Sequence, residues 1–207
     1  MVRVVRDGVF YALAMGAAAA LLWRLHPAAA LPFVVAALFC LYFFRDPERV
    51  IPPGPVAVSP ADGKVVAVRQ MEDGRRRVSI FLNVFDVHVN RCPIGGRITE
   101  VRYSPGKFKV ASLEAASAEN EQNTLVIDDG ASRVSFSQIA GLVARRIVCH
   151  KKQGDAAEKG ERFGLIKFGS RMDVVLGPEW ILAVRVGDRV KAGSSVLATP
   201  GAPDDHG

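Results

Sequence analysis

Two long stretches without charged side chains occupy most of the first 44 residues. They run from residue 8 to residue 23 and from residue 27 to residue 44, and Arg24-Leu25-His26 separates them. As helices they would be about 24 and 27 Å long, slightly shorter than the ~30 Å hydrocarbon core of a bilayer. The pattern predicts an N-terminal helical hairpin, residues 1–50, that associates with a membrane and either spans it or enters one leaflet.

Basic residues favour one orientation of this hairpin. Four arginines flank its outer ends and one lies at its turn: Arg3, Arg6, Arg45 and Arg49, against Arg24. The positive-inside tendency therefore predicts that both ends, and the remainder of the chain, lie on the cytoplasmic side of the cell membrane. A cleaved signal peptide is the alternative, suggested by the small-residue run 28–30. A signal peptide cleaved there would leave the second apolar run without a role.

The rest of the chain, residues 51–207, is predicted to be a β-rich domain. A stiff proline-rich linker, residues 51–55, precedes it. Short β-rich runs follow between Gly, Pro and Asp residues, at 64–69, 77–84, 97–103, 124–128, 132–139 and 144–150. This spacing is typical of a mainly β protein, a flattened β-barrel or sandwich. One short helix is expected at 112–121, with Ser112 as its N-cap.

A pair of glycines recurs near the C-terminus. Gly154-Asp155 is followed by Gly160, and Gly187-Asp188 by Gly193, at a shift of 33 residues. This arrangement resembles the hairpins of biotinyl and lipoyl carrier domains, in which each glycine makes a turn. No Met-Lys-Met-like tip lies between them, so the resemblance concerns the barrel or sandwich and not a carrier function.

The charge balance indicates an anionic partner. The chain has 27 Lys and Arg residues against 21 Asp and Glu residues, a formal charge of +6. Together with the hairpin, this excess favours an anionic membrane lipid over nucleic acid, for which the run 75–77 provides no recognisable motif. The three cysteines, Cys40, Cys92 and Cys149, have no metal-ligand spacing. We expect free thiols in a reducing compartment.

Gly169-Ser170 lies between two apolar, strand-like runs, 163–168 and 172–176. A Gly-Ser pair usually marks a turn. In this position the serine hydroxyl could instead attack the carbonyl of the glycine before it, because glycine has no side chain to shield that carbonyl. Such an attack would cleave the chain.

Two further residues are candidates for chemistry. Asp62 belongs to the turn 59–64, where an Asp-Gly pair ordinarily serves the turn itself. His88 follows a predicted strand, whereas the other three histidines lie in the hairpin turn, in a lysine-rich segment and in the tail. A lone histidine in a polar loop is often structural. The polar cluster 119–123 is interpreted as a solvated helix end, and no metal site is expected because no two histidines have ligand spacing.

Six segments together resemble a known family. They are Phe-Phe-Arg-Asp-Pro at 43–47, Ser-Pro-Ala-Asp-Gly-Lys at 59–64, Asp-Val-His-Val-Asn-Arg at 86–91, Tyr-Ser-Pro-Gly-Lys-Phe at 103–108, Glu-Asn-Glu-Gln-Asn at 119–123 and Phe-Gly-Ser-Arg-Met-Asp at 168–173. Their order and identity are similar to those of the short bacterial and archaeal phosphatidylserine decarboxylases, over nearly the whole chain. The resemblance implies a proenzyme that is cut between Gly169 and Ser170.

The same resemblance implies the cofactor and the chemistry. Ser170 becomes an N-terminal pyruvoyl group, and chains 1–169 and 170–207 remain together as a heterodimer. The pyruvoyl ketone forms a Schiff base with phosphatidylserine and accepts electrons as carbon dioxide leaves. Asp62 and His88 match the positions that assist Ser170 in cleavage, and His88 is the candidate that later protonates the substrate carbanion.

One position departs from the family pattern. Longer bacterial relatives have a second histidine where this chain has Arg91, so the division of roles around His88 stays open. Other readings also stay open. They are an archaetidylserine decarboxylase with ether-linked lipid tails, and a non-catalytic, membrane-tethered β-domain that binds a partner. A homo-oligomer is possible for any of them.

Overall fold

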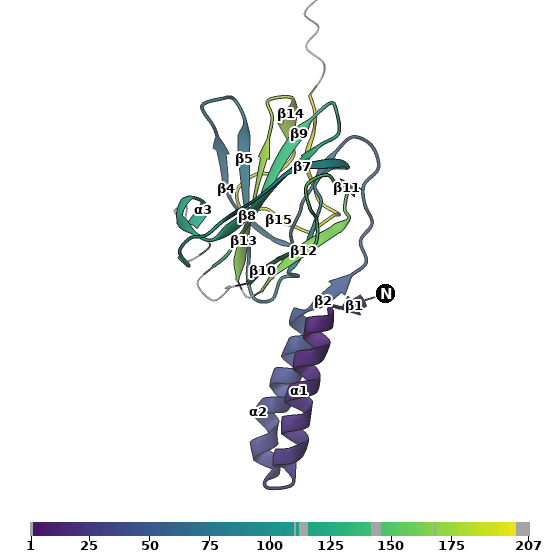
Figure 1. Ribbon diagram of the computed structural model, residues 1–207, viewed down its shortest axis with the longest axis vertical. Coiled ribbons are helices and arrows are strands. Elements are labelled where there is room, and N and C mark those ends of the chain that lie inside the picture. Colours follow the sequence, from purple (N-terminus) through teal and green to yellow (C-terminus); the bar gives the residue numbers. More distant parts are fainter. Residues whose placement is uncertain (1, 110, 112–115, 142–145, 168, 202–207) are drawn as a thin grey trace, which may run out of the picture. The chain divides into compact units, whose positions relative to one another are not determined.

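A computed structural model describes residues 2–109, 111, 116–141, 146–167 and 169–201. The chain divides into two compact units, Met1–Glu48 and Arg49–Gly207. The first is helical and the second is built from β-strands (Figure 1). The predicted fold class, mainly β with an N-terminal helical pair, is confirmed.

The first unit is a tight helical hairpin. Helix α1, Arg6–Trp23, packs beside helix α2, Pro27–Phe43 (Figure 1). The turn between them is closed by His26, whose Nδ1 accepts a hydrogen bond from the amide of Ala28 at 3.3 Å. Pro27 suits the first helical position because it has no amide hydrogen to leave unsatisfied. At the open end, strand β1, Val2–Val4, pairs with strand β2, Arg45–Pro47.

Several large apolar side chains of this hairpin face outward. Trp23 is 63% exposed and Leu25 is 79% exposed. Phe44 instead packs against Gly8, where a Cβ would lie 2.4 Å from the Phe44 Cβ, so glycine is needed for this contact. Among the described residues, no helix has both the length and the apolar character needed to cross a membrane.

The second unit consists of three antiparallel sheets. Its strands are β3 Ala57–Val58, β4 Gly63–Gln70, β5 Arg76–Leu82, β6 Val89–Arg91, β7 Gly96–Ser104, β8 Gln122–Asp128, β9 Arg133–Ile139, β10 Arg146–Cys149, β11 Ala156–Ala157, β12 Arg162–Lys167, β13 Ser170–Leu176, β14 Trp180–Leu182, β15 Arg189–Val190 and β16 Val196–Pro200. The large sheet has the order β11-β7-β8-β9-β13-β5-β4-β15, and the small sheets have the orders β10-β12-β6 and β14-β16-β3. Strand β13 therefore lies inside the large sheet, between β5 and β9.

The core follows the alternation of side chains along the strands. On β13, Met172, Val174 and Leu176 belong to the buried apolar cluster, while the residues between them lie on the other face of the sheet. Phe136 of β9 meets Phe163 of β12 edge to face, with 5.0 Å between ring centroids, and so joins the large sheet to a small one.

The three cysteines are free thiols, as expected.

Each of the two glycine segments near the C-terminus pairs with an earlier segment of the chain, and these earlier segments repeat at the same shift. The amide of Gly154 donates to the carbonyl of Ile98, and the amide of Gly187 donates to the carbonyl of Val65. Ile98 and Val65 are themselves 33 positions apart. Strand pairing repeats in the same way, because Ala157 faces Gly96 and Val190 faces Gly63. Two copies of one turn-and-strand unit thus build opposite ends of the large sheet.

The predicted helix at 112–121 is shorter in its described part. Helix α3 is a single turn, Ala116–Glu119, and Asn120 then forms a bridge with Lys107. Some predictions concern residues outside the described part of the chain: Ser112, residues 144 and 145, Phe168 and His206.

Candidate active site

The Gly169-Ser170 pair lies at the beginning of a central strand. Gly169 has a φ of +64°, a conformation that favours glycine, and Ser170 is the first residue of β13. Ser170 faces Leu82 of β5 and is fully buried. Its hydroxyl makes no hydrogen bond to any described residue. A buried hydroxyl without a hydrogen-bond partner costs about 1–3 kcal/mol.

His88 lies against the residue that precedes this serine. It precedes β6, is 2% exposed, and its Nδ1 is 3.0 Å from the carbonyl oxygen of Asp86. A carbonyl can only accept, so Nδ1 carries the proton and Nε2 is the nitrogen with a lone pair. The amide of Gly169 donates to this Nε2 at 3.4 Å. The basic nitrogen of His88 is therefore directed at the cleavage segment, one residue before the Ser170 hydroxyl.

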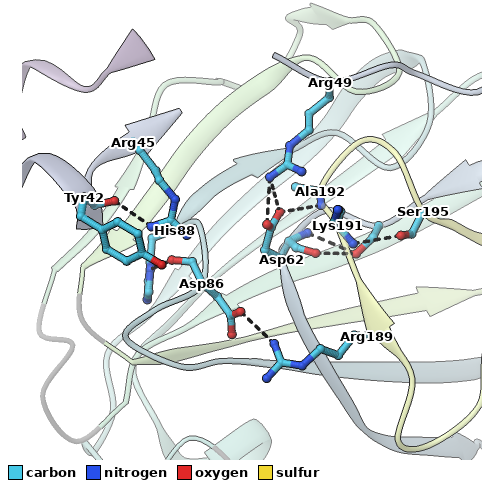
Figure 2. A network of polar contacts seen from close by, with 12 residues as sticks. Tyr42, Arg45, Arg49, Asp62, Asp86, His88, Arg189, Lys191, Ala192 and Ser195 are labelled. Atoms are coloured by element: carbon cyan, nitrogen blue, oxygen red, sulfur yellow. Dashed lines mark hydrogen bonds and ion pairs between the residues drawn. The ribbon is translucent and has the colours of Figure 1, made fainter. Parts of the chain in front are cut away.

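Asp86 holds the loop that carries His88. Its Oδ2 accepts a hydrogen bond from the amide of Asn83 at 2.9 Å, and its Oδ1 pairs with Arg189 Nη1 at 3.1 Å. Figure 2 shows the Asp86 side chain directed at Arg189, which belongs to β15. Sequence reasoning overlooked Asp86 as a positioning residue. The signal was present in Asn83 and Asp86, which are three residues apart and bond each other's backbone as turn-forming residues do.

Asp62 has other partners than the predicted histidine. Both of its carboxylate oxygens accept from Arg49 Nη2, at 2.8 and 2.9 Å, and Oδ1 also accepts from the amide of Ala192 at 2.8 Å (Figure 2). Burial raises the pKa of the Asp62 carboxyl, while the Ala192 amide and Arg49 partly oppose this shift. Among the described residues, then, the structure brings His88 to the cleavage site and places Asp62 in an ion pair with Arg49. A role of Asp62 in cleavage stays a prediction.

The internal repeat shows that this carboxylate does not serve the turn. Asp62 precedes Gly63, and the equivalent turn in the second copy has Gly95 before Gly96. A Cβ at Gly95 would face the amide of Lys159 at 3.5 Å, just as Asp62 faces the amide of Ala192. Since the second copy forms the same turn without a carboxylate, the turn itself does not require the Asp62 side chain.

Two charged residues after the serine hold β13 from its other face. Arg171 is fully buried, and its Nε pairs with Asp173 Oδ1 at 2.7 Å while its Nη2 donates to Ser79 at 2.6 Å. Asp173 also accepts from the hydroxyl of Ser117 at 2.6 Å. Buried charges that are paired and hydrogen-bonded fix the strand in position. Spacing in the sequence did not reveal this pair, because both residues stand in an otherwise apolar run.

The polar cluster 119–123 is not a solvated helix end, so that interpretation was wrong. Asn120 is 2% exposed and Asn123 is 5% exposed. The amide group of Asn120 donates to the carbonyls of Lys109 and Ala140, both at 2.8 Å, and its oxygen accepts from the amide of Lys109 at 2.9 Å. This side chain is buried because it satisfies the backbone of two segments that would otherwise lack partners.

Arg91, at the position of the second histidine of longer relatives, supports the repeat. It is 5% exposed, its Nη1 donates to the carbonyl of Gly160 at 3.0 Å, and its side chain lies against Gly193. Gly160 and Gly193 are the equivalent glycines of the two copies.

Within the described residues, no group of three His, Cys, Asp or Glu side chains comes together in a way that could hold a metal ion.

Comparisons with known proteins identify the family of this chain. A model of the phosphatidylserine decarboxylase family matches residues 36–198, which include Asp62, His88 and Ser170. A phosphatidylserine decarboxylase proenzyme of Solibacter usitatus is 61% identical over 197 residues, covering 95% of this chain and 96% of the relative. The proenzyme of Syntrophus aciditrophicus is 44% identical over 208 residues, covering 95% and 97%. The proenzyme of Magnetococcus marinus is 49% identical over 167 residues, 77% of each chain. With a family match across most of its length and relatives of this identity and coverage, the chain belongs to the phosphatidylserine decarboxylase family.

Proposed function

We propose that this chain cleaves itself between Gly169 and Ser170 and then converts phosphatidylserine to phosphatidylethanolamine and carbon dioxide. As a member of its family it is a carboxy-lyase of phospholipid biosynthesis. One observation supports the cleavage step above others. The Ser170 hydroxyl is buried and has no hydrogen-bond partner among the described residues, and the residue before it is hydrogen-bonded to Nε2 of His88.

The proposed cleavage begins with attack of the Ser170 hydroxyl oxygen on the Gly169 carbonyl carbon. The hydroxyl proton passes to a base, for which we propose His88 Nε2, and then to the Ser170 nitrogen as the carbon–nitrogen bond breaks. The product is an ester. Loss of the Ser170 α-proton then expels the Gly169 carboxylate, and the resulting enamine takes up water and releases ammonia. Chain 1–169 and a shorter chain, 170–207, result.

The surroundings of Ser170 fit the pyruvoyl group that this cleavage would leave there. The position is fully buried, no side-chain hydrogen bond would be lost, and β5 holds the strand at Leu82. The group would supply a ketone that serves as the electron sink for decarboxylation, in place of pyridoxal phosphate. His88 remains close after cleavage because Asp86 holds its ring, and we propose that it returns a proton to the substrate carbon that loses carbon dioxide.

The helical hairpin would bring the site to its lipid substrate. Its outward apolar side chains, Trp23 and Leu25 among them, suit burial in a membrane, and we propose the cell membrane as its location with the catalytic domain on the cytoplasmic side. Basic residues would add attraction to an anionic leaflet. Arg49 does not serve this purpose, because its side chain is 11% exposed and pairs with Asp62, which leaves Arg3, Arg6 and Arg45.

Denaturing mass spectrometry of the purified protein tests the cleavage. We expect chains 1–169 and 170–207, with a blocked N-terminus on the shorter chain that reacts with carbonyl reagents. Ser170→Ala should remain one inactive chain of 22.3 kDa, whereas Ser132→Ala, a serine in the turn between β8 and β9, should be cleaved normally. A decarboxylating preparation made only of intact chain would refute the proposed cleavage, whereas an intact chain without decarboxylase activity would support the non-catalytic binding domain. Assays with ester-linked and ether-linked lipids would distinguish phosphatidylserine from archaetidylserine; the relatives are named for the former.

A further inference from the structure

Gly141 lies against the carbonyl group that the proposed cleavage attacks. A Cβ at Gly141 would be 2.2 Å from the carbonyl oxygen of Gly169 and 3.2 Å from its carbonyl carbon. Real Cβ atoms do not approach an oxygen so closely, so one side of this contact must move if any larger residue is placed here. The φ angle of Gly141 is not in the left-handed region. Its backbone conformation therefore tolerates alanine, and the scissile carbonyl is the obstacle.

The Gly141 side of the contact is held firmly. The carbonyl of Ala140, the residue before it, accepts from Asn120 at 2.8 Å, and the amide of Ala140 donates to the carbonyl of Glu121 at 2.9 Å. Asn120 also bonds both backbone groups of Lys109. Ala111, two residues further, lies beside Gly141, where its Cβ would be 3.1 Å from the added Cβ. One buried side chain thus ties together the segment that contacts the Gly169 carbonyl oxygen and the segment packed beside it.

The Gly169 side of the contact can yield. Among the described residues, nothing lies within 4 Å of the position that a Cβ of Gly169 would take, and the hydrogen bond from its amide to His88 is long, at 3.4 Å. Extra volume at Gly141 would therefore turn the Gly169 carbonyl and leave the clamped segment in place. Turning this carbonyl changes the direction from which the Ser170 oxygen meets its carbon.

We propose that Gly141 and Asn120 are positioning residues for self-cleavage, Gly141 by leaving room for the scissile carbonyl oxygen and Asn120 by fixing the wall against which that oxygen rests. This inference rests on the proposed cleavage at Gly169-Ser170 and adds residues that sequence reasoning did not connect with it. It also gives the cluster 119–123 a role in the reaction, although Asn120 touches no reacting atom.

The test compares the rate at which chain 170–207 appears after synthesis of the full-length protein. Gly141→Ala should cleave about 10²-fold more slowly than the wild type, the loss expected when a reacting group is misplaced by about 1 Å. Gly95→Ala is the matched control, because an added Cβ there meets only ordinary contacts, 3.5 Å or longer, in the same unit. Cleavage of Gly141→Ala at the wild-type rate would overturn the proposal. An intact wild type would instead refute the proposed function itself.

Two further measurements separate positioning from general damage to the fold. In a Ser170→Ala background, which keeps every variant uncleaved, adding Gly141→Ala should leave the melting temperature unchanged. Hydroxylamine, which cleaves esters, should release no extra chain 170–207 from Gly141→Ala, because attack on the carbonyl is the impaired step. Rapid release would show that the ester forms normally and would overturn the assignment.

Asn120→Asp provides an independent variant. It keeps the oxygen that accepts from Lys109 and loses both donations to the carbonyls of Lys109 and Ala140. We expect slower cleavage and, again, no ester for hydroxylamine to cleave. If Gly141→Ala fails to fold in the Ser170→Ala background, this variant decides the question, and wild-type cleavage by Asn120→Asp would refute the proposal.

Discussion

Asp62 and Gly95 occupy the same position in two copies of one turn, and only Asp62 carries a carboxylate. Each precedes a glycine that pairs with a short strand, Gly63 with Val190 and Gly96 with Ala157. The copy that has Gly95 forms the same turn, so the fold requires no side chain at this position. The carboxylate of Asp62 is therefore an addition to the repeat, and its partners are Arg49 and the amide of Ala192.

We expect replacement of Asp62 by asparagine to slow or abolish cleavage, because the family resemblance implies that this carboxylate assists Ser170; in the structure it pairs with Arg49 and the amide of Ala192. Any fraction that does mature should keep substantial decarboxylase activity, since the pyruvoyl group is then already formed. Cleavage is followed by mass spectrometry and activity by release of carbon dioxide per pyruvoyl group. Asp73→Asn, in an exposed turn, is the control. Normal cleavage of Asp62→Asn would exclude Asp62 from processing.

The raised pKa of Asp62 predicts a specific dependence of stability on pH. Folding raises this pKa above its ordinary value of 3.8, so the folded protein binds the proton more tightly than the unfolded chain does. The stabilisation that this protonated carboxyl gives the folded protein is fully present below the ordinary pKa of 3.8. It is lost as the pH rises through the raised pKa. In a Ser170→Ala background, the free energy of unfolding should therefore fall with rising pH across this window more steeply than with Asp62→Asn added. Parallel pH profiles of the two proteins would contradict the burial argument.

Substituting His88 by alanine should impair both steps, each by about 10²–10⁴-fold, the usual contribution of a positioned acid–base group. The reason is geometric, because Nε2 contacts the cleavage segment and the ring stays fixed by Asp86. His150→Ala, an exposed histidine beyond β10, is the matched control. Mature His88→Ala enzyme with confirmed pyruvoyl content and near-normal release of carbon dioxide would exclude the second role.

Protein lacking residues 1–44 should leave the membrane fraction and still cleave itself. Asp62, His88 and Ser170 all lie in the second compact unit, which begins at Arg49. Fractionation followed by mass spectrometry of the soluble and membrane pools measures both properties. Full retention in the membrane pool would indicate another anchor, and loss of cleavage would show that the hairpin helps to assemble the site.

Local sequence patterns predicted the elements of this fold better than the contacts between them. Apolar runs and punctuating glycines located the hairpin and most strands, since both features act over a few residues. The repeat was only half visible, because Ser-Pro-Ala-Asp-Gly-Lys and Cys-Pro-Ile-Gly-Gly-Arg share little except Pro60 with Pro93 and Gly63 with Gly96. The conserved feature is a backbone turn, which several residue types can form.

Long-range pairings were beyond local patterns. Asp62 was expected beside His88, but in the described residues it pairs with Arg49, which had been assigned to the membrane flank. Asn120 was read as solvated because asparagine is usually exposed, and it is buried because two distant backbone segments need its amide. Such partners depend on which segments the whole chain brings together, and no window of sequence contains that information.

The place of Ser170 at the head of β13 determines how firmly a prosthetic group made from it would be retained. A coenzyme that binds reversibly fills its site only to the extent that its concentration exceeds its dissociation constant. A group that is itself the first residue of β13 has no such equilibrium. To lose it, the enzyme would have to strip β13 from β5 along the whole register from Ser170 to Leu176, and from β9 on its other side. Occupancy would therefore be fixed by the stability of the sheet and would not vary with the cell's supply of any vitamin.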